Sequence, residues 1–138
     1  ISEKLSTSQD AIKIKKIHKS VKRLKIAETF TLKTVSPVYP LTKIYIPNIL
    51  LGFADYHSGM LWPWISCLYA LAISKVSKPE AKKIIQKLGQ KIIEYKDCYE
   101  VYEPNGTPVK RWFYKSEHPF AWFAGTFVYS YRELFSKS

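Results

Sequence analysis

Glycine, cysteine and histidine are scarce in this sequence, and each shortage excludes a kind of site. Five glycines occur in 138 residues, and they form neither a phosphate-binding loop nor a Gly-x-Ser-x-Gly nucleophile elbow. Two cysteines, Cys67 and Cys98, cannot build a disulfide framework and lack the spacing of metal ligands. The histidines, His18, His57 and His118, are equally far apart in the sequence. We therefore expect no metal site and no cofactor.

Long apolar runs are also lacking. The longest, residues 60–73, has 14 residues and includes Ser66, so it is too short to span a bilayer and fits a buried helix. The N-terminus is polar and Lys-rich, without the apolar core and cleavage site of a signal peptide. These features predict a cytoplasmic protein with no membrane partner.

Basic residues outnumber acidic residues by 22 to 11, which gives a net charge of +11. The excess lies in residues 1–25 (+6) and 75–138 (+5), whereas residues 26–74 are neutral. Such a charge supports electrostatic binding to nucleic acid. The basic segment 8–26, however, carries no groove-reading motif and no interleaved aromatic residues, so we interpret it as a solvated helix face. A basic nucleic-acid-binding helical domain stays as an alternative that the sequence disfavours.

Hydrophobic periodicity predicts an all-α fold in a single domain covering residues 1–138. The predicted helices span residues 8–26, 60–77, 79–95 and 119–135. Ser77 followed by Glu80 resembles a capping box at the start of the third helix. The 60–77 helix is apolar almost all round, and therefore needs neighbours on several sides.

The segments between these helices are long and aromatic. Residues 28–59 contain three prolines in a stretch rich in Thr, Val, Tyr and Ile, which predicts extended segments and turns rather than helix. Residues 98–114 predict an irregular hairpin around the Asn105-Gly106 turn. Aromatic residues make up 15% of the chain, a content that suits a core or a site that stacks sugar faces.

The first candidate site lies just ahead of the apolar helix and reads Tyr56-His57-Ser58-Gly59-Met60-Leu61-Trp62-Pro63-Trp64. His57 supplies a hydrogen-bonding group, and Gly59 allows close approach of the backbone. Trp62 and Trp64 supply large apolar faces. The same stretch also fits the start of a helix whose tryptophans belong to the core, and both interpretations stay open.

The second candidate is the hairpin stretch that contains Glu100 and Tyr102, which share one face of an extended segment. A carboxylate flanked by aromatic side chains is partly desolvated, which suits general acid or base work. By strand alternation, Glu103 should face solvent. The alternative is an ordinary surface hairpin with exposed acids. Trp122, near the start of the last helix, belongs either to the core or to the same site.

Taken in this order, the three stretches resemble the C-terminal part of an (α/α)6-barrel glycosidase domain. The resemblance is to the amylo-α-1,6-glucosidase (glycogen-debranching) family and to the related mannosyl-oligosaccharide glucosidases. The first family has a Tyr-His-x-Gly-x-x-Trp-Pro-Trp stretch, which Tyr56 to Trp64 matches at every fixed position. Both families have a late Glu-x-Tyr-x-Pro-x-x-Gly-like stretch and an aromatic-Trp pair, similar to residues 100–106 and 120–122, with Gly106 one residue early. The resemblance covers roughly residues 28–135.

The resemblance implies a partial (α/α)6 toroid of helical hairpins, with long aromatic loops, one small β-hairpin and a saccharide site. Because the Glu of the late stretch is the catalytic base in the related glucosidases, that role falls on Glu100. Tyr56, His57, Gly59, Trp62, Trp64, Tyr102 and Trp122 would bind substrate. These families invert configuration, and their general acid lies in the earlier half of the barrel, which the sequence does not include.

The expected function is therefore that of the C-terminal half of an inverting glycosidase, of α-glucosidase or debranching type, acting on an oligo- or polysaccharide. We expect a homodimer or pairing with an upstream half of the same domain, and no catalysis without that half. A carbohydrate-binding remnant without catalysis is the alternative within the same resemblance.

Overall fold

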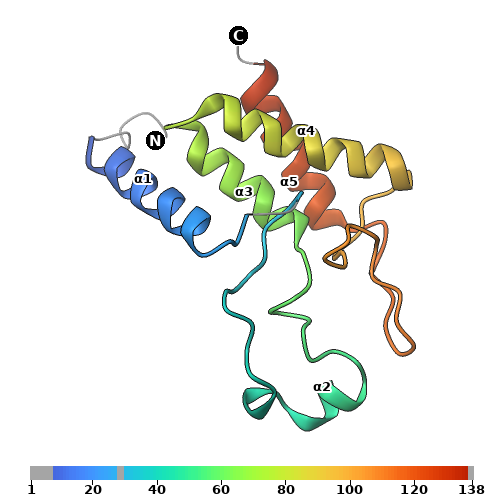
Figure 1. The fold of residues 1–138 in the computed structure, drawn as a ribbon. Coiled ribbons are helices and arrows are strands. Elements are labelled where there is room, and N and C mark those ends of the chain that lie inside the picture. The colour runs from blue at the N-terminus through green and yellow to red at the C-terminus, as the bar shows by residue number, and fades with distance from the viewer. Residues whose placement is uncertain (1–7, 28–29, 137–138) are drawn as a thin grey trace.

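The fold is almost entirely helical, as the computed structural model of residues 8–27 and 30–136 shows (Figure 1). The described chain forms a helical body from α1 (Ser8–Arg23), α3 (Pro63–Ser74), α4 (Lys78–Tyr95) and α5 (Ala121–Tyr131), which continues into one π-helical turn, η2 (Arg132–Ser136). Within the described residues, β structure consists of isolated bridges. The prediction of an all-α fold is confirmed.

Helix α3 lies at the centre of the helical body and contacts α1, α4 and α5 (Figure 1). Its buried side chains form one core with residues of α4, α5 and η2, namely Cys67, Ala70, Ile73, Ala81, Ile85, Leu88, Phe123 and Leu134. A helix that is apolar almost all round needs this many neighbours. The partners expected for α3 are therefore supplied mostly by α4 and α5.

The start of α4 differs from the predicted capping box. Ser77 precedes the helix, but its side chain makes no cap hydrogen bond. Glu80 instead reaches across to α1, where Lys22 Nζ lies 2.9 Å and His18 Nε2 3.1 Å from its carboxylate oxygens. His18 Nδ1 also lies 2.5 Å from the Tyr69 hydroxyl of α3. Two basic groups on α1 thus take the carboxylate that a capping box would use.

The second part of the molecule, called the loop end here, comprises residues 30–62 and 98–116. It extends from one end of the helical body in Figure 1. It contains a 3₁₀ turn, η1 (Leu41–Lys43), and a short helix, α2 (Ile46–Leu50), where the sequence predicted only extended segments and turns. Pro47 sits in the first turn of α2, where a missing backbone N–H costs no helical hydrogen bond. Proline there starts a helix rather than excluding one.

Extended segments of the loop end pair beside the start of α3. Leu61 and Tyr102 exchange both backbone hydrogen bonds, at 2.8 and 3.0 Å. The Trp62 amide donates to the Leu32 carbonyl at 3.2 Å. The predicted hairpin is also present: the Glu103 amide donates to the Thr107 carbonyl at 2.8 Å across the turn. Gly106 has φ of +87°, a conformation that favours glycine.

Much of the apolar surface of the loop end is exposed. Leu41, Tyr45, Ile46 and Leu50 all lie in the segment around α2, and Leu50 is 77% exposed. The loop end therefore gains little stability from burial around α2, and its shape depends on specific contacts closer to the body.

No helix in the described ranges is both long enough and apolar enough to cross a membrane.

Candidate functional site

The Tyr56–Trp64 stretch folds as a tight turn followed by the first residues of α3. The carbonyl of Asp55 accepts hydrogen bonds from the amides of Ser58, Gly59 and Met60, at 3.0, 2.6 and 3.1 Å. A Cβ on Gly59 would lie 2.8 Å from the Cβ of Asp55, which is closer than real Cβ contacts. The glycine is thus required by the approach of the chain to itself. Whether it also admits a ligand stays a prediction.

In this turn, the side chains of three predicted site residues pack ring against ring. The Trp62 ring is 8% exposed, and its indole N–H donates to the Tyr56 carbonyl at 3.1 Å. His57 stacks on Trp62, with ring centroids 5.8 Å apart and planes 8° apart. Tyr56 meets Trp62 edge-on at 5.0 Å. Trp62 therefore serves as a buried platform, and the exposed His57 ring lies on top of it.

Glu100 lies against this turn, although it is 44 residues away in the sequence. The Tyr56 hydroxyl donates to Glu100 Oε1 at 2.9 Å, and the Tyr114 hydroxyl donates to Oε2. Burial, assisted by the hydrogen bond to Glu100, raises the pKa of Tyr56 to about 12. The same two causes raise the pKa of Tyr114 well above its usual value. Both phenols stay protonated at neutral pH and hold the half-buried carboxylate in place.

Three other predicted site residues have different neighbours. Tyr102 is fully buried, and its ring packs against Phe30, Tyr95 and Tyr99 rather than against the Glu100 site. Trp64 is half-buried and meets Trp122 edge-on, with centroids 5.6 Å apart. Trp122 is 63% exposed on α5. The structure thus unites Tyr56, His57, Trp62 and Glu100. Trp64 packs against the buried cluster that contains Trp62 and also contacts Trp122.

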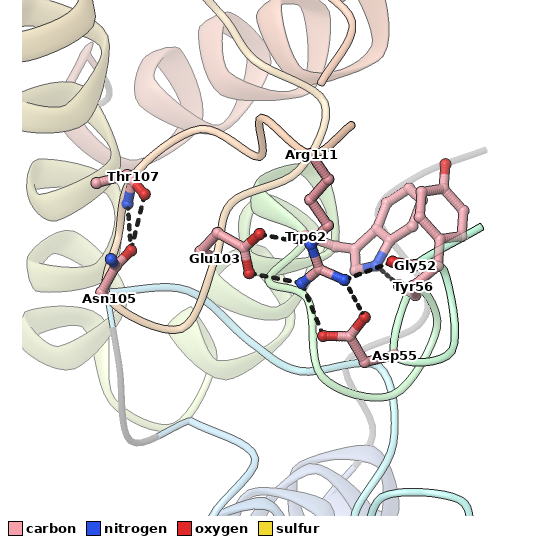
Figure 2. Close-up of polar contacts among 8 residues, drawn as sticks. All are labelled: Gly52, Asp55, Tyr56, Trp62, Glu103, Asn105, Thr107 and Arg111. Carbon is pink, nitrogen blue, oxygen red and sulfur yellow. Dashed lines mark hydrogen bonds and ion pairs between the residues drawn. The ribbon is translucent and has the colours of Figure 1, made fainter. Parts of the chain in front are cut away.

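An arginine that the sequence analysis did not single out holds the loop end together (Figure 2). Arg111 donates to both carboxylate oxygens of Asp55, at 2.5 and 2.9 Å, and to both of Glu103, at 2.7 Å each. A fifth hydrogen bond, at 2.7 Å, reaches the Gly52 carbonyl. These contacts use all five N–H groups of the guanidinium. We call Arg111, Asp55, Glu103 and Gly52 the Arg111 cluster.

The Arg111 cluster corrects the expectation for Glu103. That side chain is 23% exposed and paired with Arg111, so it does not project freely into solvent as strand alternation suggested. The hydrogen bonds from Arg111 also lower the pKa of Asp55 against the opposing effect of burial. The sequence offered one signal for this cluster, namely that Arg111 lies in the same predicted hairpin as Glu103. Nothing in the sequence placed Asp55 beside them.

A pocket of about 410 Å³ opens beside the site. Its lining includes Tyr56, His57 and Tyr114, together with five residues from the 39–48 segment: Tyr39, Lys43, Ile44, Tyr45 and Asn48. Glu100 does not line this pocket, although two of the tyrosines that line it, Tyr56 and Tyr114, donate hydrogen bonds to Glu100. The carboxylate therefore lies behind a pair of phenols rather than in the open cavity. A ring-shaped ligand in the pocket would contact aromatic side chains first.

The residues described here form no group of three or more His, Cys, Asp or Glu side chains arranged to hold a metal ion. Cys67 and Cys98 are both free thiols. What the site offers chemically is therefore a positioned carboxylate, two neutral phenols, an imidazole and several aromatic faces.

Comparison with protein-family models, with curated proteins and with solved structures gives no match for this chain. The resemblance to the glycosidase families thus rests on the residues of the three stretches, and the function is argued from the site itself.

Proposed function

We propose that this chain is the C-terminal part of an inverting glycosidase domain of α-glucosidase or debranching type, working in the cytoplasm on an oligo- or polysaccharide. The observation that carries the proposal is the position of Glu100, held by the Tyr56 and Tyr114 hydroxyls beside the His57–Trp62 stack. A positioned carboxylate next to aromatic faces is the arrangement that general base catalysis on a sugar requires.

In the proposed reaction Glu100 acts on water. Each carboxylate oxygen accepts one tyrosine hydroxyl and keeps a further lone-pair position for a water molecule. That water attacks the anomeric carbon while Glu100 takes its proton. The glycosidic C–O bond breaks, and the leaving oxygen receives a proton from a second carboxylic acid. In this proposal the second acid comes from the earlier half of the barrel.

The same proposal gives a role to exposed apolar side chains of the helical body. Leu68 on α3 and Trp122, Val128 and Tyr129 on α5 are exposed. In a complete (α/α)6 toroid, neighbouring helical hairpins would cover such faces. The partner is then the upstream half of the same domain or a second copy of the chain. Sedimentation at micromolar concentration tests this point, and a strict monomer with no affinity for an upstream half contradicts it.

The catalytic role is tested by Glu100→Gln in the protein that includes both halves, with an α-linked glucan as substrate. The near-isosteric change should lower the rate by roughly 10²–10⁴-fold. Proton NMR of the wild-type product should show the β-anomer first, as inversion requires. Glu117→Gln, which alters an exposed carboxylate just beyond residues 98–116, is the matched control: its charge has only a small effect on Tyr56, so the rate should change far less than in Glu100→Gln. An unchanged rate in Glu100→Gln would show that Glu100 is not the base.

A second candidate function is saccharide binding without hydrolysis. The observation in its favour is that both oxygens of Glu100 already accept hydroxyls and that the carboxylate does not line the pocket. In that case, glucan should change the tryptophan fluorescence of the protein with no release of reducing sugar. Release of reducing sugar by the wild-type protein with both halves, and its loss in Glu100→Gln, would favour catalysis over binding alone.

A further inference from the structure

The pocket beside the candidate site is lined by a positively charged side chain and by no acidic one among the described residues. Lys43, from η1, is the only permanently charged side chain among the described residues that line it, and none of these is an Asp or Glu. The nearest acid in sequence, Asp55, is already paired with Arg111 through two hydrogen bonds. The pocket therefore presents a cation that no lining acid compensates, in a chain whose net charge is +11.

Ser58 lines the same pocket, but its hydroxyl is closed off from it. The residue is 1% exposed, and its Oγ is buried without a hydrogen-bond partner among the described residues. Lys43 is therefore the lining group left to balance a negative charge on a ligand.

The remaining walls suit a ring. Tyr39, Tyr45 and Phe53 contribute aromatic surface, and Asn48 contributes an amide that can donate and accept hydrogen bonds. The cavity of about 410 Å³ lies within the usual range for small-molecule sites, roughly 300–1,000 Å³. Aromatic faces with a few polar groups are the features expected of a site for a sugar ring, and the lysine adds an anion-binding group.

We propose that this pocket binds a saccharide unit that carries an anionic substituent, a phosphate or a carboxylate, with Lys43 as the group that recognises the substituent. The proposal rests on the proposed function for the saccharide and adds that the saccharide is negatively charged. Lys43 forms the ion pair with the anion, and the aromatic wall stacks on the ring.

Calorimetric titration with glucose, glucose 6-phosphate, glucuronic acid and inorganic phosphate tests the proposal on the full chain. At least one anionic sugar should bind about two- to fivefold more tightly than glucose, the upper range of an exposed ion pair. The tighter of the two identifies the substituent as phosphate or carboxylate. Equal affinity for glucose and both anionic sugars overturns the proposal, as does the absence of binding. Inorganic phosphate binding as tightly as glucose 6-phosphate overturns the role of the ring.

A matched pair of variants assigns the contact. Lys43→Gln should abolish the preference for the anionic sugar, whereas Lys13→Gln on α1 removes the same charge outside the pocket lining and should preserve it. A preference that survives in Lys43→Gln, or that is lost equally in Lys13→Gln, overturns the role of Lys43.

These results are separable from the catalytic proposal. Neutral glucan hydrolysis depends on Glu100, which does not line the pocket, so it does not require Lys43. Loss of the charge preference with normal Glu100-dependent hydrolysis would overturn only the inference about the substituent.

Discussion

The helical body and the loop end are stabilised by different physical means. In the body, apolar side chains of α3, α4 and α5 are completely buried against one another, with Leu88 and Phe123 at the centre. In the loop end, the segment around α2 leaves its apolar side chains exposed, and an arginine joins segments that lie more than fifty residues apart. The body therefore depends on one large apolar core, whereas the loop end combines a smaller core of Met60, Trp62, Val101 and Val109 with the polar contacts of Arg111.

The largest expected effect is in the body. Leu88→Ala should lower the free energy of unfolding by about 2–5 kcal/mol, because it removes buried methyl groups and leaves a cavity. Ile93→Ala is the matched control on the same helix: Ile93 is 78% exposed, so its change should stay within about 0.5 kcal/mol. Denaturant unfolding followed by circular dichroism measures both. Similar losses in the two variants would contradict the assigned core.

The next largest effect is expected in the loop end, on replacement of Arg111. Arg111→Gln leaves two half-buried carboxylates, Asp55 and Glu103, without their donor, and should cost about 1–3 kcal/mol. Limited proteolysis should show faster cleavage around α2 while the helical circular dichroism of the body is retained. Adding Asp55→Asn and Glu103→Gln to Arg111→Gln should restore part of the loss, because the uncompensated charges are gone. A triple variant less stable than Arg111→Gln would contradict an electrostatic origin.

Acid should weaken the same contacts by a smaller amount. The pKa of Asp55 is lower in the folded protein than the ordinary value of 3.8. Its contribution is therefore fully present above pH 3.8 and disappears as the pH falls through the folded-state pKa. Because the pair is partly exposed, we expect about 0.2–1 kcal/mol. Thermal unfolding from pH 7 to pH 3 should show a shallower dependence in Arg111→Gln than in the wild type, and identical profiles would contradict the assignment.

The smallest effect concerns the start of α4. Ser77→Ala should change the free energy of unfolding by less than about 0.5 kcal/mol, because the Ser77 side chain makes no cap hydrogen bond. A working cap would cost about 0.5–2 kcal/mol on the same change. Glu80→Gln is the informative partner, since it removes the pairing with Lys22 on α1. If Ser77→Ala proves more damaging than Glu80→Gln, the capping box exists in solution.

These contrasts show which features the sequence could predict. The long helices follow from local periodicity, and the hairpin follows from Asn105-Gly106, since neither depends on distant residues. Ser77 and Glu80 fit a capping box locally, but Lys22 and His18 lie close to Glu80 only after α1 has docked. Helix α2 was not predicted because residues 28–59 contain three prolines. Pro47, however, lies in the first turn of α2, where a helix tolerates proline.

Part of the candidate site was predictable because its residues carry motifs. The Tyr56–Trp64 stretch and Glu100 were selected separately, and the structure brings them within hydrogen-bond distance through Tyr56. Tyr114 and Arg111 were missed because their roles depend on partners far along the chain. Tyr102 was selected for sharing a face with Glu100, yet the irregular backbone directs it to other aromatic residues.

The buried thiol of Cys67 allows the opening of the helical body to be measured by chemical labelling. It is completely buried in α3, and burial raises its pKa to about 12, so the reactive thiolate is almost absent in the folded state. Alkylation of Cys67 therefore records how often the body opens. Cys98 is half-buried and packs against the edge of the same core, so it should be labelled earlier than Cys67. The two labelling rates, measured in one reaction, therefore compare a partial with a complete opening of the body.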